Sequence, residues 1–399
     1  MPRSPGRRRL LALAAGIASL AGLPGCAPAD RAVLAAPGCP EGTASPRPVA
    51  VGPGTVHTWL PPFESAGAPP RPPATGTPTA VPGWDDVVSV ASTGHTTAAV
   101  HADGTVSAYG TGHRGSLGDG DPRRHHAPTP RPVPGITDAR SVHAVGQAFF
   151  VVRTDGTVLA WGDGFLARGG VREGERAEPS PIPVDGLRDV VAVSEGDLAA
   201  IALLGDGTVA GWGVNLTAVL GDRDRTDVTV VDDVRGVTSV AAAGGAVVAA
   251  TSSGRVCAWG NNVHGLLGVE PTGGQTGRPV GLAAPTGVVQ VAGGRDVAFA
   301  LDGAGAVWAW GRGVQGVLGD GEVADHVSAV PRVVPGLPPA RLIGAYGLTG
   351  YAVDGDGGLW AWGSGLALGG LSEGAAVRPV RIPLPGPVLA VSGAHALVG

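Results

Sequence analysis

The chain has 399 residues, of which 69 are glycine and 36 are proline, a share typical of low-complexity chains unless the glycines recur at a fixed period. Hydrophobic residues make up 43% and charged residues 15%, so the chain can bury a core, which excludes disorder along most of its length. The net charge of −5, with no lysine, excludes a broadly basic nucleic-acid-binding protein.

The N-terminus carries the features of an export signal. Arg7, Arg8 and Arg9 precede an apolar run over 10–23 that is too short to span a membrane comfortably, which predicts a signal peptide over 1–25. The adjacent arginines also permit a twin-arginine route. Leu23-Pro24-Gly25-Cys26 resembles a bacterial lipoprotein box, and the resemblance implies lipid attachment at Cys26. Cleavage after Ala27-Pro28-Ala29 is the alternative and would release a soluble protein.

Residues 26–48 are rich in Ala, Pro and Gly, which predicts a tether between the outer face of the cell membrane and the folded part. Cys39 lies in this tether, and Cys257 lies far along the chain. An oxidising compartment permits a disulfide between them. The sequence leaves open whether the two cysteines pair or remain free thiols.

An aromatic ring, usually followed by glycine, recurs about every 51 residues over 49–399. The rings are Trp59, Tyr109, Trp161, Trp212, Trp259, Trp310 and Trp362. A glycine lies five residues before each ring, and in four copies aspartate precedes that glycine, as in Asp103-Gly104. An Asp-Gly pair between apolar runs predicts a hairpin with a type I′ turn. Between this glycine and the ring the side chains alternate, which predicts a strand packed between two neighbouring sheets.

Each copy contains signals for about four short strands, which is typical of a propeller blade. The first copy starts at Gly54 without its earlier strands, and the last copy stops at Gly399 without its glycine-to-ring strand. Because the missing parts are complementary, we expect Gly54–Trp59 to pair beside Val388–Val398. The predicted fold is all-β: a seven-bladed β-propeller over 49–399, closed by its N- and C-terminal strands.

The repeat resembles that of the regulator of chromosome condensation, a family of seven-bladed propellers. The resemblance is carried by the segments Val90–Gly104 and Val256–Gly268, the latter reading VCAWGNNVHGLLG. The eukaryotic founder of that family is an exchange factor for a nuclear GTPase and binds nucleosomes, but an export signal replaces its basic tail here, so that activity is not expected. An exported bacterial branch of the fold includes an inhibitor of β-lactamases, which makes an inhibitor a second hypothesis.

No catalytic signature is strong enough to predict an enzyme, a cofactor or a metal. Gly110-Thr-Gly112-His-Arg-Gly115 fits a phosphate-loop pattern but recurs as a turn and has no βαβ unit around it. Ser392 to His395 lacks a nucleophile elbow. Counting from the glycine landmark places His95 and His395 at equivalent blade positions, where we expect a structural role.

Acidic residues follow a Leu-Gly pair in three copies. Because carboxylates one blade apart lie far from each other, we interpret them as solvated loop charge rather than as a calcium site. They are Asp119, Asp121, Asp222, Asp224, Asp320 and Glu322.

The most distinctive loop concentrates three arginines and three histidines in a mildly acidic chain. These are His113, Arg114, Arg123, Arg124, His125 and His126. The loop is either a solvated surface or a contact patch for an acidic partner; adjacent histidines are poorly placed to chelate one ion. Phe165 stands where the usual turn is replaced and is either a further partner contact or a core residue. Trp308 and Trp360 are interpreted as blade packing.

The sequence therefore predicts an exported, lipid-anchored and monomeric scaffold that binds an unknown protein at the cell surface and has no catalysis of its own. One alternative is an inhibitor of a secreted or cell-wall enzyme. The other is a lyase or hydrolase that uses the central channel. An enzyme would place carboxylates or histidines with shifted pKa values at one mouth of the channel.

Overall fold

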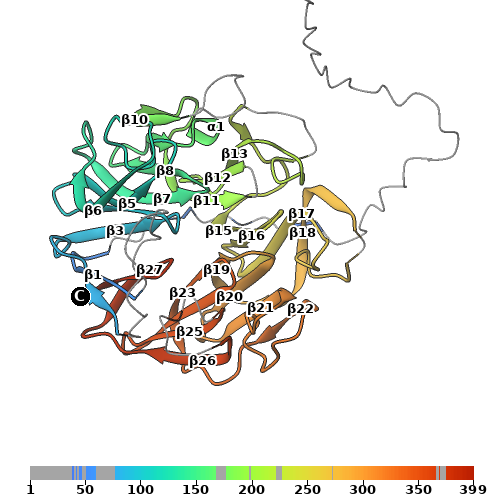
Figure 1. Ribbon diagram of the computed structural model, residues 1–399. Coiled ribbons are helices and arrows are strands. Elements are labelled where there is room, and N and C mark those ends of the chain that lie inside the picture. Colours follow the sequence, from blue (N-terminus) through green and yellow to red (C-terminus); the bar gives the residue numbers. More distant parts are fainter. Residues whose placement is uncertain are drawn as a thin grey trace, which may run out of the picture. The chain divides into compact units, whose positions relative to one another are not determined.

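Seven four-stranded antiparallel sheets form the architecture of the computed structural model (Figure 1). The structure describes residues 38, 39, 42, 45, 46, 51–59, 77–167, 177–196, 199–221, 227–271, 273–364, 368 and 374–399. All of them belong to one compact unit, Val33–Gly399. The predicted signal peptide, Cys26 and most of the predicted tether lie outside the described residues.

Six of the sheets are built from four strands that follow one another in sequence, and we number them blades 1 to 6. Blades 1 to 3 comprise β3 (Val87–Ser92), β4 (Thr96–His101), β5 (Val106–Gly112), β6 (His125–Pro132); β7 (Ala139–Val145), β8 (Ala148–Arg153), β9 (Val158–Gly162), β10 (Glu178–Pro183); β11 (Val190–Gly196), β12 (Ala199–Leu204), β13 (Val209–Gly213) and β14 (Thr229–Val230). Blades 4 to 6 comprise β15 (Val237–Ala243), β16 (Ala246–Thr251), β17 (Arg255–Asn261), β18 (Gln275–Thr286); β19 (Val288–Gly293), β20 (Val297–Asp302), β21 (Val307–Gly313), β22 (His326–Val333); β23 (Ala340–Tyr346), β24 (Thr349–Asp354), β25 (Leu359–Gly363) and β26 (Ala376–Ile382).

The seventh sheet, the closing blade, draws its strands from both ends of the described chain. Its order is β2 (Thr79–Ala80), β1 (Thr55–Thr58), β28 (His395–Val398) and β27 (Val388–Ser392). Val56 pairs with Leu397, and Thr58 pairs with His395. Figure 1 shows the blue β1 in the same sheet as the red β27. The predicted closure and the seven-bladed, all-β fold are confirmed; the described helix is a single turn, α1 (Gly164–Ala167).

The innermost strands form an uninterrupted cycle. β3 contacts β7, and the contacts continue through β11, β15, β19, β23 and β27 back to β3. Side chains tie neighbours together: Ser89 Oγ accepts a hydrogen bond from Val142 N at 3.1 Å, and Gln290 bonds the backbone N and O of Ile343. These bonds hold the blades at fixed positions around a central cavity.

The aspartate–glycine pairs form hairpins as predicted, but the type I′ prediction is wrong. Gly104 has a φ of +82°, but Asp103 does not have a positive φ. A type I′ turn needs a positive φ at both of its central residues. Asp103 Oδ1 instead accepts bonds from Thr105 N at 2.9 Å and Thr105 Oγ1 at 2.7 Å. The aspartate therefore stabilises the turn through its side chain.

Five of the recurring tryptophans join blades 2 to 6 to the blade before each of them. Trp161 donates its indole N–H to Ser116 O at 3.0 Å, and Trp259 donates to Val219 O at 2.8 Å. Trp212, Trp310 and Trp362 do the same with Leu166, Leu266 and Val317. These five indoles are fully buried. Each satisfies a turn carbonyl while filling the interface between two sheets, which explains why the aromatic period matches the blade period.

Two further tryptophans stabilise single hairpins. Trp308 donates to Asp302 Oδ2 at 3.0 Å, and Trp360 donates to Asp354 Oδ2 at 2.9 Å. Both are only half-buried, and Trp308 packs against the core between blades 4 and 5. The interpretation as blade packing is confirmed for Trp308, whereas for Trp360 the structure shows the bond within its own hairpin.

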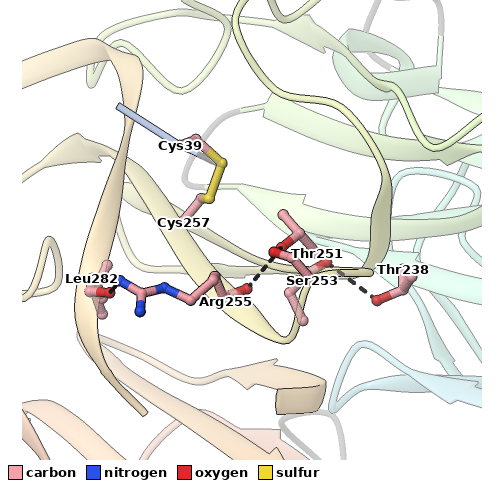
Figure 2. The surroundings of a disulfide bond; sticks show 8 residues. Cys39, Thr238, Thr251, Ser253, Arg255, Cys257 and Leu282 are labelled. Atoms are coloured by element: carbon pink, nitrogen blue, oxygen red, sulfur yellow. Dashed lines mark hydrogen bonds between the residues drawn. A yellow bond between two sulfur atoms is a disulfide. The ribbon is translucent and has the colours of Figure 1, made fainter. Parts of the chain in front are cut away.

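A disulfide joins Cys39 to Cys257 across 218 positions of sequence, and Figure 2 shows it beside β17. Cys39 packs against the apolar cluster between blades 3 and 4, and Gly42 N bonds Arg235 O at 3.3 Å. Part of the segment interpreted as a free tether is therefore fastened to the propeller wall. A cross-link of this length stabilises a fold by about 2–5 kcal/mol.

Candidate functional site

The central cavity has a volume of about 820 Å³ and is lined by the innermost strands of all seven blades. Small residues and backbone dominate its wall, and its larger polar side chains are His143, Gln147, Arg295 and Tyr346. The described lining contains no carboxylate; Glu195 lies on β11, but its side chain is not described. Across the part of the chain that is described, no group of three His, Cys, Asp or Glu side chains could hold a metal ion.

His143 is the one histidine on the cavity wall among the described lining residues. Burial lowers its pKa to about 4, and the nearby Arg140 guanidinium adds to the effect. Its Nε2 lies 3.0 Å from Ser141 Oγ.

The predicted basic patch lies on the loop between β5 and β6 and at the start of β6, and most of its charge is already paired. Arg114 Nη1 lies 2.5 Å from Asp163 Oδ2, and Arg123 Nη2 lies 2.6 Å from Asp121 Oδ2. The Arg123 hydrogen bonds hold the pKa of Asp121 far below its usual range. Arg124 and His113 are exposed. The structure thus places these six residues on one loop and the strand that follows it, but leaves less free positive charge than the sequence suggested.

His125, the first residue of β6, holds the end of this loop in place through two hydrogen bonds. Its Nδ1 lies 2.9 Å from Arg123 O, and its Nε2 lies 2.8 Å from Asp119 Oδ2. Because both ring nitrogens face acceptors, the protonated imidazolium is favoured, and these bonds raise the pKa of His125. His126 contacts Thr111 Oγ1 through Nδ1 at 3.3 Å.

The same pair of histidine hydrogen bonds recurs in blade 5. His326 Nδ1 lies 2.8 Å from Ala324 O, and its Nε2 lies 2.9 Å from Asp320 Oδ2. Arg114 and Gln315 occupy matching positions with the same φ of +53°. The two loops therefore share one backbone design. At its tip, blade 1 carries Arg123 and Arg124, whereas blade 5 carries Ala324 and Asp325.

This geometry corrects the interpretation of the acidic loop residues as solvated charge. Asp119 and Asp320 each bind a histidine, and Asp121 binds an arginine. Glu322 is exposed, while Asp222 and Asp224 lie outside the described residues. A spacing of six residues from Asp to His after Leu-Gly is the signal that could have found the pairs. The backbone of Phe165 lies in α1, and its side chain is not described.

A row of exposed valines on the outermost strand of blade 5 was missed by sequence reasoning. Val327, Val330 and Val333 of β22 are 43%, 56% and 50% exposed. The matching residues of β6 are His126, Thr129 and Pro132. An alignment of the segments 125–132 and 326–333 would have revealed this difference.

Residues 253–301 and 304–345 match the regulator of chromosome condensation (RCC1) repeat. Among curated proteins, no sequence matches the chain.

Solved structures reproduce the whole ring. Prp20p from Saccharomyces cerevisiae, described with its binding to Gsp1p and histones, is similar with a TM-score of 0.74 and 20% identity over 88% of this chain and 92% of that chain. Human WBSCR16 is similar with a TM-score of 0.72 and 21% identity over 87% of this chain and 98% of that chain. At these identities the likeness establishes the fold alone: the chain is a seven-bladed β-propeller with RCC1-like repeats.

Proposed function

We propose that this chain is an exported, non-enzymatic scaffold that presents the loops of one propeller face to a protein partner at the cell surface. The observation that carries the proposal is the pair of matched loops in blades 1 and 5. An aspartate–histidine pair fixes the same backbone in both, while the exposed tips carry different side chains. Rigid frames with variable tips suit recognition of a specific surface.

The Cys39–Cys257 disulfide supports the export part of the proposal, because such bonds persist in oxidising compartments and are rare in the cytosol. The described residues include no helix long and apolar enough to cross a membrane. Attachment through a lipid on Cys26 is the form of membrane association that we propose. Related propellers such as Prp20p bind proteins, which agrees with a binding role but does not name this partner.

Mass spectrometry of the mature N-terminus tests the anchor. We expect the first residue to be Cys26 carrying a diacylglycerol thioether. A mature chain that begins unmodified at Asp30 would show that the protein is released in soluble form, while leaving the binding proposal intact.

Charge reversal at the loop tip of blade 1 tests the binding surface. We expect the double variant Arg123→Glu/Arg124→Glu to lose a partner that the wild-type chain captures by cross-linking in the native cell envelope. With the purified partner, its affinity should fall at least about tenfold. Ala324→Glu, at the matching position of blade 5, serves as the control and should bind normally. Equal binding by all three chains would show that the blade 1 loop is not the contact.

The captured partner also separates the remaining hypotheses. A secreted or cell-wall enzyme that loses activity on binding would make the chain an inhibitor. An envelope protein without such an effect would make it a scaffold in the narrower sense. Failure to capture any saturable partner would contradict the proposal.

A further inference from the structure

The junction between the closing blade and blade 1 differs in chemistry from the other described junctions. At five of the other six junctions a tryptophan indole, which does not titrate, bonds a backbone carbonyl of the preceding blade. At the sixth, between blade 6 and the closing blade, the ring of Trp59 packs against that of Tyr351. Here Tyr109 stands in the place of tryptophan, and its hydroxyl lies 2.9 Å from His395 Nε2. A titratable side chain therefore occupies the junction at which the two chain ends close the ring.

His395 occupies a core position, which overturns its predicted equivalence with His95. It pairs with Thr58, one residue before the landmark ring. In the other blades the corresponding partners are Ala98, Phe150, Ile201, Val248, Phe299 and Tyr351. All of these are buried, and His395 itself is only 6% exposed, whereas His95 lies exposed in a turn. The closing blade thus carries an imidazole at a position that is otherwise apolar or aromatic.

The described contacts of His395 include no acidic side chain; its partner on β27 is Ser392. On β5 it faces Tyr109, on β4 it meets Thr97 Oγ1 at 3.4 Å, and on β1 its strand partner is Thr58. Tyr109 is the one titratable group among these neighbours, and burial raises its pKa, so it stays neutral. Burial lowers the pKa of His395 to about 4, against a smaller opposing effect of the Ser392 backbone.

We propose that this junction is an acid-sensitive latch: protonation of His395 places an unpaired charge between β28 and β5 and loosens the strand pairing that closes the ring. The lowered pKa of His395 makes the fold less stable in acid. The folded state holds the His395 imidazole neutral. The contribution of the neutral imidazole to the stability of the fold is therefore complete above the unfolded pKa of about 6.5, and it is lost as the pH falls towards 4. His125 and His326 act in the opposite direction, because their pKa values are raised in the folded state.

Hydrogen exchange and urea unfolding of the full chain between pH 8 and pH 4 test the latch. We compare the wild type with His395→Phe, since phenylalanine occupies the matching positions in blades 2 and 5. On going from pH 7 to pH 4, the folding equilibrium constant of the wild type should fall on the order of 10²-fold more than that of the variant. Amides of β1 and β28 should lose protection in acid before those of β12 and β13, and only in the wild type.

Two additional variants complete the test, one as a control and one as a substitute for His395→Phe. His143→Gln removes the other histidine whose pKa is lowered to about 4, and it should leave the acid loss at β1 and β28 unchanged. His395→Gln serves if phenylalanine prevents folding, because an amide cannot take up the proton. Identical pH profiles for the wild type and both His395 variants, or acid loss that begins at another blade, would overturn the proposal.

Discussion

Replacing Trp259 by alanine should lower the free energy of unfolding by about 3–5 kcal/mol. The indole is fully buried between blades 3 and 4, so the substitution leaves a large cavity. It also removes the partner of Val219 O, an additional cost because a buried carbonyl is left unpaired. Urea unfolding followed by circular dichroism measures the difference.

Trp308→Ala is the matched control for this prediction. Trp308 lies on the equivalent strand of the next blade, but it is half-buried and bonds an aspartate of its own hairpin. We expect this variant to lose about 1–2 kcal/mol. Similar losses for Trp259→Ala and Trp308→Ala would contradict the role of the landmark indoles as links between blades.

Introducing aspartate at Val56 should lower the stability by more than about 4 kcal/mol, because a carboxylate would be buried without a partner in the closing blade. The milder Val56→Ala should cost about 2 kcal/mol, close to the cost of Val209→Ala at the same position of blade 3. Both valines are fully buried, although the strand of Val56 lies far in sequence from its partner strand β28. Urea unfolding compares the variants.

The outcome for Val56 distinguishes a closed ring from an open one. If β1 did not belong to the closing blade, Val56→Ala would have almost no effect while Val209→Ala would keep its full cost. Thr55→Asp, at a half-buried position of the same strand, controls for a general intolerance of charge and should cost far less.

The ring and its closure were predictable because they rest on spacing. Tyr109 and the recurring tryptophans mark one strand per blade, and the complementary ends at Gly54 and Val388 fix where the chain meets itself. The turn type was not predictable from the Asp-Gly pair alone. The side chain of Asp103 bonds Thr105, and this local bond stabilises a turn in which only the glycine needs a positive φ.

Contacts between distant residues were beyond the sequence pattern. The pairing of Cys39 with Cys257 depends on where a Pro-rich segment lies on the finished ring. The neutralisation of Arg114 by Asp163 depends on the neighbouring blade. His395 was misplaced because its half of the blade ends before the glycine landmark and because its hairpin strands are short, with 5 residues in β27 and 4 in β28 against 7 and 6 in β7 and β8. The pairing of His395 with Thr58 shows its true position.

The most direct test of the closed ring is a disulfide engineered between its two ends. Val56 and Leu397 are directly opposite each other in the pairing of β1 with β28, so Val56→Cys/Leu397→Cys should oxidise within a single chain. Peptide mapping without reduction should then recover a fragment containing residue 56 joined to one containing residue 397. The control pair Val56→Cys/Val391→Cys, which is not adjacent, should stay reduced. Free thiols or bonds only between chains in the first variant would contradict the account.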